Sequence, residues 1–164
     1  MRIGIVGADG TKWKPEQVDD VKKLIRHILI SYTSKRQYDW VTNQTILVFD
    51  EVVLVSGHCP LGGVDIWAEA VADELGIKKE IYPPEVNQWN DLLHQGIVKK
   101  GYKSRNIDIA VACNVLHCIE PYYRQRSGGM WTLRYAESLG KEVHQHVLSQ
   151  NKQSNRKPKL SKYD

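Results

Sequence analysis

Short apolar runs alternate with longer amphipathic segments along most of this 164-residue chain. The apolar runs, which predict strands, occupy residues 2–6, 51–56, 79–82, 115–119 and 143–148. Between them, apolar residues recur at helical spacing over residues 15–32, 64–75, 104–111 and 130–139, and less regularly over residues 86–100. Pro15 and Ser104 are placed to begin two of these helices. A parallel sheet covered by helices produces this alternation, so we predict an α/β fold.

The length of the chain suits a single domain, because domains of about 100–200 residues are the most common. We place this domain at residues 1–148 and treat residues 33–44, which lack a clear period, as an insertion or extended connection. The net charge of +4 comes entirely from residues 149–164, because 18 basic and 18 acidic residues precede them. We predict that this basic tail is disordered and that the domain is neutral overall.

Nothing in the sequence predicts insertion into a membrane or secretion. No apolar stretch approaches the ~20 residues of a membrane-spanning helix, and the apolar run at residues 1–7 is too short for a signal peptide. The three cysteines, without a secretory segment, do not indicate a disulfide framework. We therefore expect a cytoplasmic protein that does not associate with membranes.

Two glycine loops, at residues 56–63 and 127–132, each lie between a predicted strand and a predicted helix. At such a junction the free backbone N–H groups and the helix dipole favour an anion, and glycine allows a phosphate to approach the backbone. Loops at the carboxyl ends of parallel strands converge on one crevice, and Gly7 and Gly10 are expected at its rim. The pattern therefore predicts a Rossmann-like three-layer sandwich that binds a phosphorylated ligand.

Standard phosphate-binding signatures are absent from these loops. The chain has no Gly-x-x-x-x-Gly-Lys-Ser/Thr sequence, and the glycines at positions 4, 7 and 10 do not have Gly-x-Gly-x-x-Gly spacing. ATP hydrolysis of the P-loop type is therefore disfavoured.

An ordered set of short motifs resembles the SLOG superfamily of Rossmann-like proteins. The set comprises Ser-Gly-(x)4-Gly-Gly-Val-Asp-x-Trp-Ala-Glu from Ser56, a Tyr-Pro-Pro after the next strand, an Arg-Asn pair and a late Ser-Gly-Gly-x-x-Thr. It extends over roughly residues 1–148, with residues 33–44 outside it. The resemblance implies a small stand-alone protein, distantly similar to phosphoribohydrolases and to DNA-processing proteins.

The resemblance also implies a nucleotide or nucleotide derivative as the ligand and assigns candidate binding residues to it. Together with a glycine of the rim and the serine that begins the late motif, they are Gly7, Ser56, Gly57, Gly62, Gly63, Asp65, Arg105, Asn106, Ser127, Gly128, Gly129 and Thr132. The arginine suits this role because its planar guanidinium can hold a phosphate through two parallel hydrogen bonds. His58 occupies a loop position that is usually glycine in the superfamily, which would narrow the pocket.

The catalytic motif of the phosphoribohydrolase branch is incomplete in this chain. Where that branch reads Pro-Gly-Gly-x-Gly-Thr-x-x-Glu, this chain has Ser127 for the proline, Trp131 for the third glycine and Tyr135 for the glutamate. Cleavage of an N-glycosidic bond benefits from a carboxylate near the developing oxocarbenium charge, and tyrosine does not supply one. Asp65 and Glu69, four residues apart on one helix side, are substitute carboxylates, although Asp65 could simply stabilise the helix start.

Metal binding is not indicated by the histidines and cysteines. Those at positions 58, 59, 113, 117 and 118 have no paired Cys-x-x-Cys or His-x-x-x-His spacing, and His144 and His146 lack a third ligand. We therefore expect neither a metal nor a resident cofactor.

Three functions follow as hypotheses. The first is non-catalytic binding of a nucleotide-like small molecule, as in a sensor or carrier. The second is a nucleoside monophosphate phosphoribohydrolase that uses Asp65 or Glu69. The third is binding of single-stranded nucleic acid, which the neutral charge of the domain disfavours. A homodimer is compatible with the resemblance alone.

Overall fold

A five-stranded parallel sheet forms the centre of the protein in the computed structural model, which describes residues 1–49, 51–122 and 126–148. The strand order is β5-β4-β1-β8-β9, and all four neighbouring pairs are parallel. The strands are β1 (Arg2–Gly7), β4 (Val53–Ser56), β5 (Lys78–Ile81), β8 (Val115–Glu120) and β9 (Glu142–Val147). The five strands predicted from the sequence are thus confirmed to within two residues at each end. The predicted tail, residues 149–164, lies outside the described residues.

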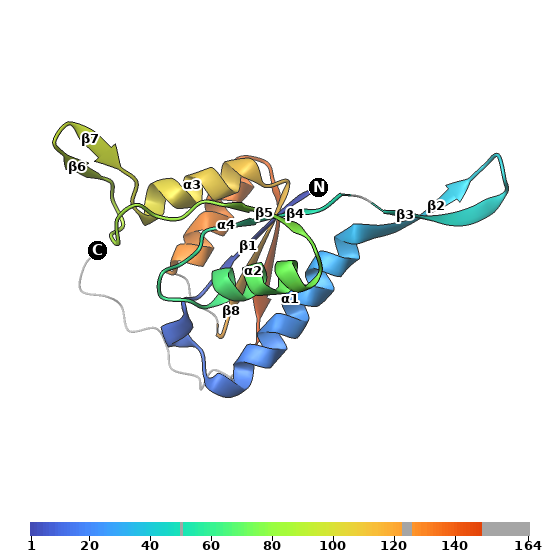
Figure 1. Ribbon diagram of the computed structural model, residues 1–164, viewed down its shortest axis with the longest axis horizontal. Coiled ribbons are helices and arrows are strands. Elements are labelled where there is room, and N and C mark those ends of the chain that lie inside the picture. Colours follow the sequence, from blue (N-terminus) through green and yellow to red (C-terminus); the bar gives the residue numbers. More distant parts are fainter. Residues whose placement is uncertain (50, 123–125, 149–164) are drawn as a thin grey trace, which may run out of the picture.

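Four helices cover the two faces of this sheet (Figure 1). On one face α1 (Val18–Thr33) packs beside α2 (Val64–Glu74), and on the other α3 (Tyr102–Ala112) packs beside α4 (Gly128–Ser138). Two short 3-10 helices, η1 (Gly10–Lys12) and η2 (Pro15–Gln17), precede α1. Each face has its own hydrophobic cluster of fully or nearly buried aliphatic residues. The predicted three-layer sandwich is therefore confirmed. No described helix is both long and apolar enough to cross a membrane.

Two β-hairpins extend from opposite ends of the sandwich in the view of Figure 1. The first, β2 (Ser34–Asp39) with β3 (Gln44–Phe49), lies between α1 and β4. It includes the segment that the sequence analysis treated as an insertion or extended connection. The second, β6 (Leu92–His94) with β7 (Ile97–Lys99), lies where an irregular helical segment was predicted. That prediction is wrong.

The turn of the second hairpin explains the error. Gln95 and Gly96, which join β6 to β7, both have a positive φ, of 51° and 75°. Two-residue turns with positive φ at both positions match the right-handed twist of a hairpin and usually contain glycine at the second position. The mostly apolar triplets on either side of Gln95-Gly96 are therefore typical of a hairpin. Their apolar residues also fit an irregular helical spacing, and this fit led to the wrong prediction.

The start of α3 also differs from the prediction. Ser104 lies inside the first turn rather than at the cap, and its hydroxyl donates to Asp91 Oδ2 at 2.8 Å. The other oxygen of Asp91 accepts from the backbone N–H of Gly101 at 2.8 Å. Asp91 therefore binds both the backbone before α3 and the hydroxyl of Ser104, so this serine does not cap the helix.

A cluster of three histidines, His117 of β8 with His144 and His146 of β9, stacks on the sheet. The Nδ1 atom of His117 lies 2.9 Å from His146 Nε2, and its Nε2 atom lies 3.1 Å from the hydroxyl oxygen of Tyr32. Burial, together with the two neighbouring histidines, lowers the pKa of His117 to about 3. Among the described residues no group of histidine, cysteine, aspartate or glutamate side chains has the arrangement of a metal site.

This cluster predicts that the protein loses stability as the pH falls from about 6.5 towards 3. The imidazole of His117 takes up a proton near pH 6.5 in the unfolded chain but stays neutral in the folded one, so acid favours unfolding. Urea midpoints at pH 7.5 and pH 5.0 measure the loss before most carboxylates titrate. His117→Leu should reduce the difference between the two midpoints, whereas His27→Leu, at an exposed position of α1, should retain it. Equal differences in both variants would contradict this assignment.

Candidate functional site

The strand order reverses at β1, because the chain first builds outward through β4 and β5 and then crosses to β8 and β9 on the other side. The loops that leave the carboxyl ends of β1 and β8 therefore diverge to opposite faces and leave a crevice between them. A pocket of about 270 Å³ lies there. Its wall contains residues from the loop after β1, the loop after β4, α2, α3 and α4.

The N-terminus of α4 forms one wall of this pocket. Ser127 caps the helix: its hydroxyl oxygen accepts from the backbone N–H of Met130 at 3.1 Å and donates to Glu120 Oε1 at 2.6 Å. Gly128 and Gly129 form the first turn, where backbone N–H groups have no partner within the helix. The positive end of the helix dipole therefore lies against the pocket, in the arrangement that favours anions.

Glycine occurs at the two positions of this turn for different structural reasons. A Cβ atom on Gly129 would lie 2.9 Å from the sulfur of Cys118 and 3.1 Å from the Cα atom of Gly7, so α4 could not approach the sheet so closely. A Cβ atom on Gly128 would meet nothing nearer than the side-chain nitrogen of Asn106 at 3.9 Å. Gly129 is thus required by packing, whereas Gly128 leaves space open at the pocket wall.

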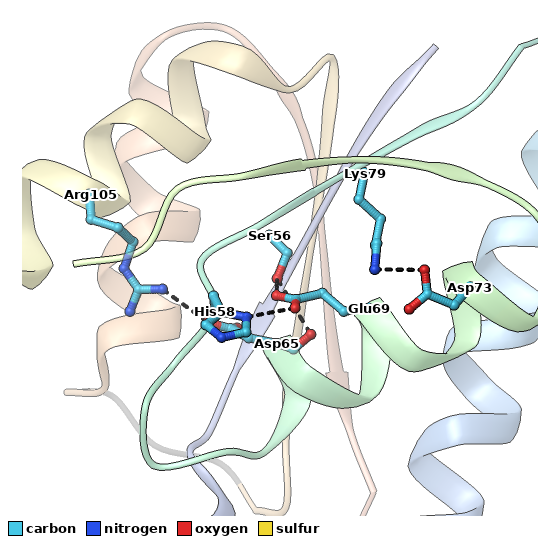
Figure 2. Close-up of polar contacts among 7 residues, drawn as sticks. All are labelled: Ser56, His58, Asp65, Glu69, Asp73, Lys79 and Arg105. Carbon is cyan, nitrogen blue, oxygen red and sulfur yellow. Dashed lines mark hydrogen bonds and ion pairs between the residues drawn. The ribbon is translucent and has the colours of Figure 1, made fainter. Parts of the chain in front are cut away.

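A buried ion pair joins α2 and α3 at the same pocket. Arg105 Nη1 lies 2.9 Å from Asp65 Oδ2, and the two side chains are 8% and 7% exposed (Figure 2). Burial raises the pKa of Asp65, and the guanidinium of Arg105 opposes that shift. The Nε atom of Arg105 has no hydrogen-bond partner among the described residues, although it is buried. The side chain of Arg105 lines the pocket and therefore brings a positive charge to its wall.

Of the twelve predicted binding residues, the structure brings eight to the pocket wall. They are Gly7, Asp65, Arg105, Asn106, Ser127, Gly128, Gly129 and Thr132. Their contact with a ligand stays a prediction.

The other four predicted residues do not line the pocket, and they are Ser56, Gly57, Gly62 and Gly63. The three glycines affect the wall indirectly. A Cβ atom on Gly57 would lie 1.6 Å from Arg105 Nη1, so this glycine makes room for the guanidinium. Gly62 and Gly63 have φ angles of 73° and 92°, which side chains rarely adopt, and they turn the loop into α2.

Glu69 and His58 form a second polar cluster beside the ion pair. The Glu69 carboxylate accepts from Ser56 Oγ at 2.8 Å and lies 2.7 Å from His58 Nδ1 (Figure 2). His58 has a φ of 48°, a left-handed conformation that is uncommon outside glycine. Neither Glu69 nor His58 lines the pocket, so Asp65 is the one of the two proposed substitute carboxylates that reaches it.

Seven residues of the wall were not predicted from the sequence, and they are Val6, Ala8, Asp9, Cys59, Leu61, Trp89 and Tyr102. Cys59 and Leu61 lie in the first glycine loop, and Val6, Ala8 and Asp9 adjoin Gly7, so these five could have been inferred from their neighbours. Trp89 lies in the segment that was predicted as helical, and only its tertiary position brings it to the pocket.

No protein-family model and no curated protein sequence matches this chain. Among solved structures, it is similar to DNA processing protein A (DprA) from Streptococcus pneumoniae, with 18% identity and a TM-score of 0.58. The alignment covers 92% of this chain and 52% of DprA, so the chain spans about half the length of that protein. It is also similar to the molybdenum cofactor carrier protein MCP from Chlamydomonas reinhardtii, with 17% identity and a TM-score of 0.53. That alignment covers 88% of this chain and 74% of the carrier protein.

These likenesses concern the fold. They agree with the predicted Rossmann-like arrangement, in which a parallel sheet lies between two layers of helices.

Proposed function

We propose that this protein binds a nucleotide or a nucleotide-like phosphorylated molecule in the pocket at the carboxyl ends of β1 and β8. The observation that carries the proposal is the buried guanidinium of Arg105, which lines a pocket that also contains the N-terminus of α4 and whose Nε atom lacks a partner among the described residues. A buried donor without an acceptor costs free energy, and a phosphate oxygen would satisfy it. The cofactor carrier protein among the structural neighbours fits a binding role.

The size of the pocket favours a small ligand. Its volume of about 270 Å³ lies near the lower end of the range of about 300–1,000 Å³ that is usual for ligand sites. We therefore favour a mononucleotide over a dinucleotide.

Binding without hydrolysis is the form of the proposal that the contacts support best. Asp65 is held by Arg105, and Glu69 is held by Ser56 and His58 outside the pocket wall. Tyr135, at the position of the catalytic glutamate in the resembling motif, stacks on Trp131 and also lies outside the wall. A phosphoribohydrolase would have to use Asp65 while that carboxylate remains paired.

Thermal unfolding with nucleoside mono- and diphosphates tests the binding proposal. A ligand at a hundred times its Kd should raise the Tm by about 5–10 °C for a chain of this length. Gly128→Leu should abolish this rise, because the new side chain would occupy the pocket wall without a clash in the backbone. The control, Ser138→Leu, adds the same side chain at an exposed position of α4 and should keep the rise. An unchanged Tm with every nucleotide, or equal rises in both variants, would contradict the proposal.

A further inference from the structure

Part of the pocket wall is aromatic. Trp89 and Tyr102 both line the pocket, and the Trp89 side chain is 39% exposed. The guanidinium of Arg105 lies over the ring of Tyr102, with its carbon 5.5 Å from the ring centroid. A single pocket thus combines a guanidinium with two aromatic side chains, of which Trp89 is partly exposed.

Two further aromatic rings, which do not line the pocket, form a series of contacts with Trp89. Trp131 meets Trp89 edge to face, with centroids 5.3 Å apart at an interplanar angle of 88°. Tyr135 stacks on Trp131 at 5.3 Å and 7°. We call Trp89, Trp131 and Tyr135 the aromatic ladder. Edge-to-face and stacked arrangements with this spacing are favourable for aromatic pairs, so the ladder restricts the orientation of Trp89.

Backbone contacts also fix Trp89 in place. Its carbonyl oxygen accepts from the N–H of Lys103 at 2.9 Å, and the carbonyl oxygen of Gln88 accepts from the N–H of Tyr102 at 2.8 Å. These are N–H groups of the first turn of α3, which have no partners within the helix. Trp89 is therefore tied to the same helix that carries Arg105, and its position does not depend on a ligand.

Two members of the ladder occupy positions at which this chain departs from the resembling motif. Trp131 stands in place of the third glycine and Tyr135 in place of the glutamate. The substitutions that remove the acidic group therefore also supply the support for Trp89.

We propose that Trp89 stacks on the base of the bound nucleotide, while Arg105 and the first turn of α4 hold its phosphate. The ligand class is accordingly a nucleoside 5′-monophosphate rather than a sugar phosphate without a base. This inference rests on the proposed function and adds that the ligand carries a base as well as a phosphate. Stacking of one base on an aromatic side chain contributes about 1–3 kcal/mol to binding. Removal of the Trp89 ring should therefore weaken nucleotide binding roughly 5- to 150-fold.

Calorimetry with matched ligands tests the inference. The probes are the four common nucleoside 5′-monophosphates and ribose 5-phosphate, which shares their phosphate and sugar but has no base. The unmodified protein should bind at least one nucleotide about 5-fold or more tightly than ribose 5-phosphate. Trp89→Ala should lose that preference and keep its affinity for ribose 5-phosphate, and Trp89→Phe should restore much of the preference. Trp40→Ala, which removes an 86% exposed tryptophan from the first hairpin, is the matched control.

The outcomes separate this inference from the function on which it rests. Equal affinity for ribose 5-phosphate and every nucleotide, or a preference that survives Trp89→Ala, would overturn base stacking and leave phosphate binding intact. Absence of binding to all five probes would overturn the proposed function itself. Tighter binding of an oligonucleotide than of any mononucleotide would overturn the small-molecule assignment.

Discussion

Replacing Arg105 by methionine is expected to lower the free energy of unfolding by about 3–5 kcal/mol, the usual cost of breaking a buried ion pair by removing one partner. The substitution leaves the carboxylate of Asp65 buried without the guanidinium that lies 2.9 Å from it. Urea unfolding at pH 7.5 measures this loss. The same variant should no longer bind nucleotides, because it removes the guanidinium that lines the pocket.

The double variant Asp65→Asn with Arg105→Met is the control for the charge. It removes both partners, so no buried charge remains unpaired, and it should recover part of the lost stability without recovering nucleotide binding. A loss of free energy of unfolding below about 1 kcal/mol in the single variant is typical of a solvent-exposed ion pair. That result would contradict the burial of the pair between Asp65 and Arg105. Nucleotide binding by either variant would contradict the role of Arg105.

Gly7→Ala should produce the second largest effect, a loss of about 3 kcal/mol, at the upper end of the range for overpacking. A Cβ atom at this position would lie 2.1 Å from the backbone oxygen of Ile119 and 2.8 Å from a methyl group of Val64. Because the first obstacle is backbone of the paired strand β8, it cannot move aside as a side chain can. Urea unfolding again measures the loss.

Gly128→Ala is the matched control for this prediction. It makes the same substitution in the same pocket, but at a site where the nearest atom is 3.9 Å away. It should leave stability unchanged or slightly increased, because alanine is more favourable than glycine in a helix. Equal losses in the two variants would show that the close contact at Gly7 does not determine the cost.

Much of the fold follows from local patterns in the sequence. The apolar runs predicted the strands of the central sheet, and the helical spacing over residues 64–75 predicted α2, because each element buries one continuous apolar surface. The glycine loops were recognisable for the same reason, since each directly follows such a strand. Position in a parallel sheet was then sufficient to place Gly7 and Gly128 at one pocket.

The contacts across the pocket could not be predicted in this way. Asp65 and Arg105 lie 40 positions apart on two different helices, and the space for their pairing comes from Gly57. Local spacing suggested instead that Asp65 interacts with its own helix. Trp89 was missed because its segment forms a hairpin and an irregular connection, whose position depends on contacts with the first turn of α3.

A crystal structure of the protein with its tightest-binding nucleoside 5′-monophosphate tests the central claim most directly. We expect the phosphate to lie within about 2.7–3.2 Å of the guanidinium of Arg105 and of backbone nitrogens in the first turn of α4. We also expect the base to lie against the ring of Trp89. A nucleotide bound elsewhere, with the pocket between β1, α3 and α4 left empty, would contradict the proposed site.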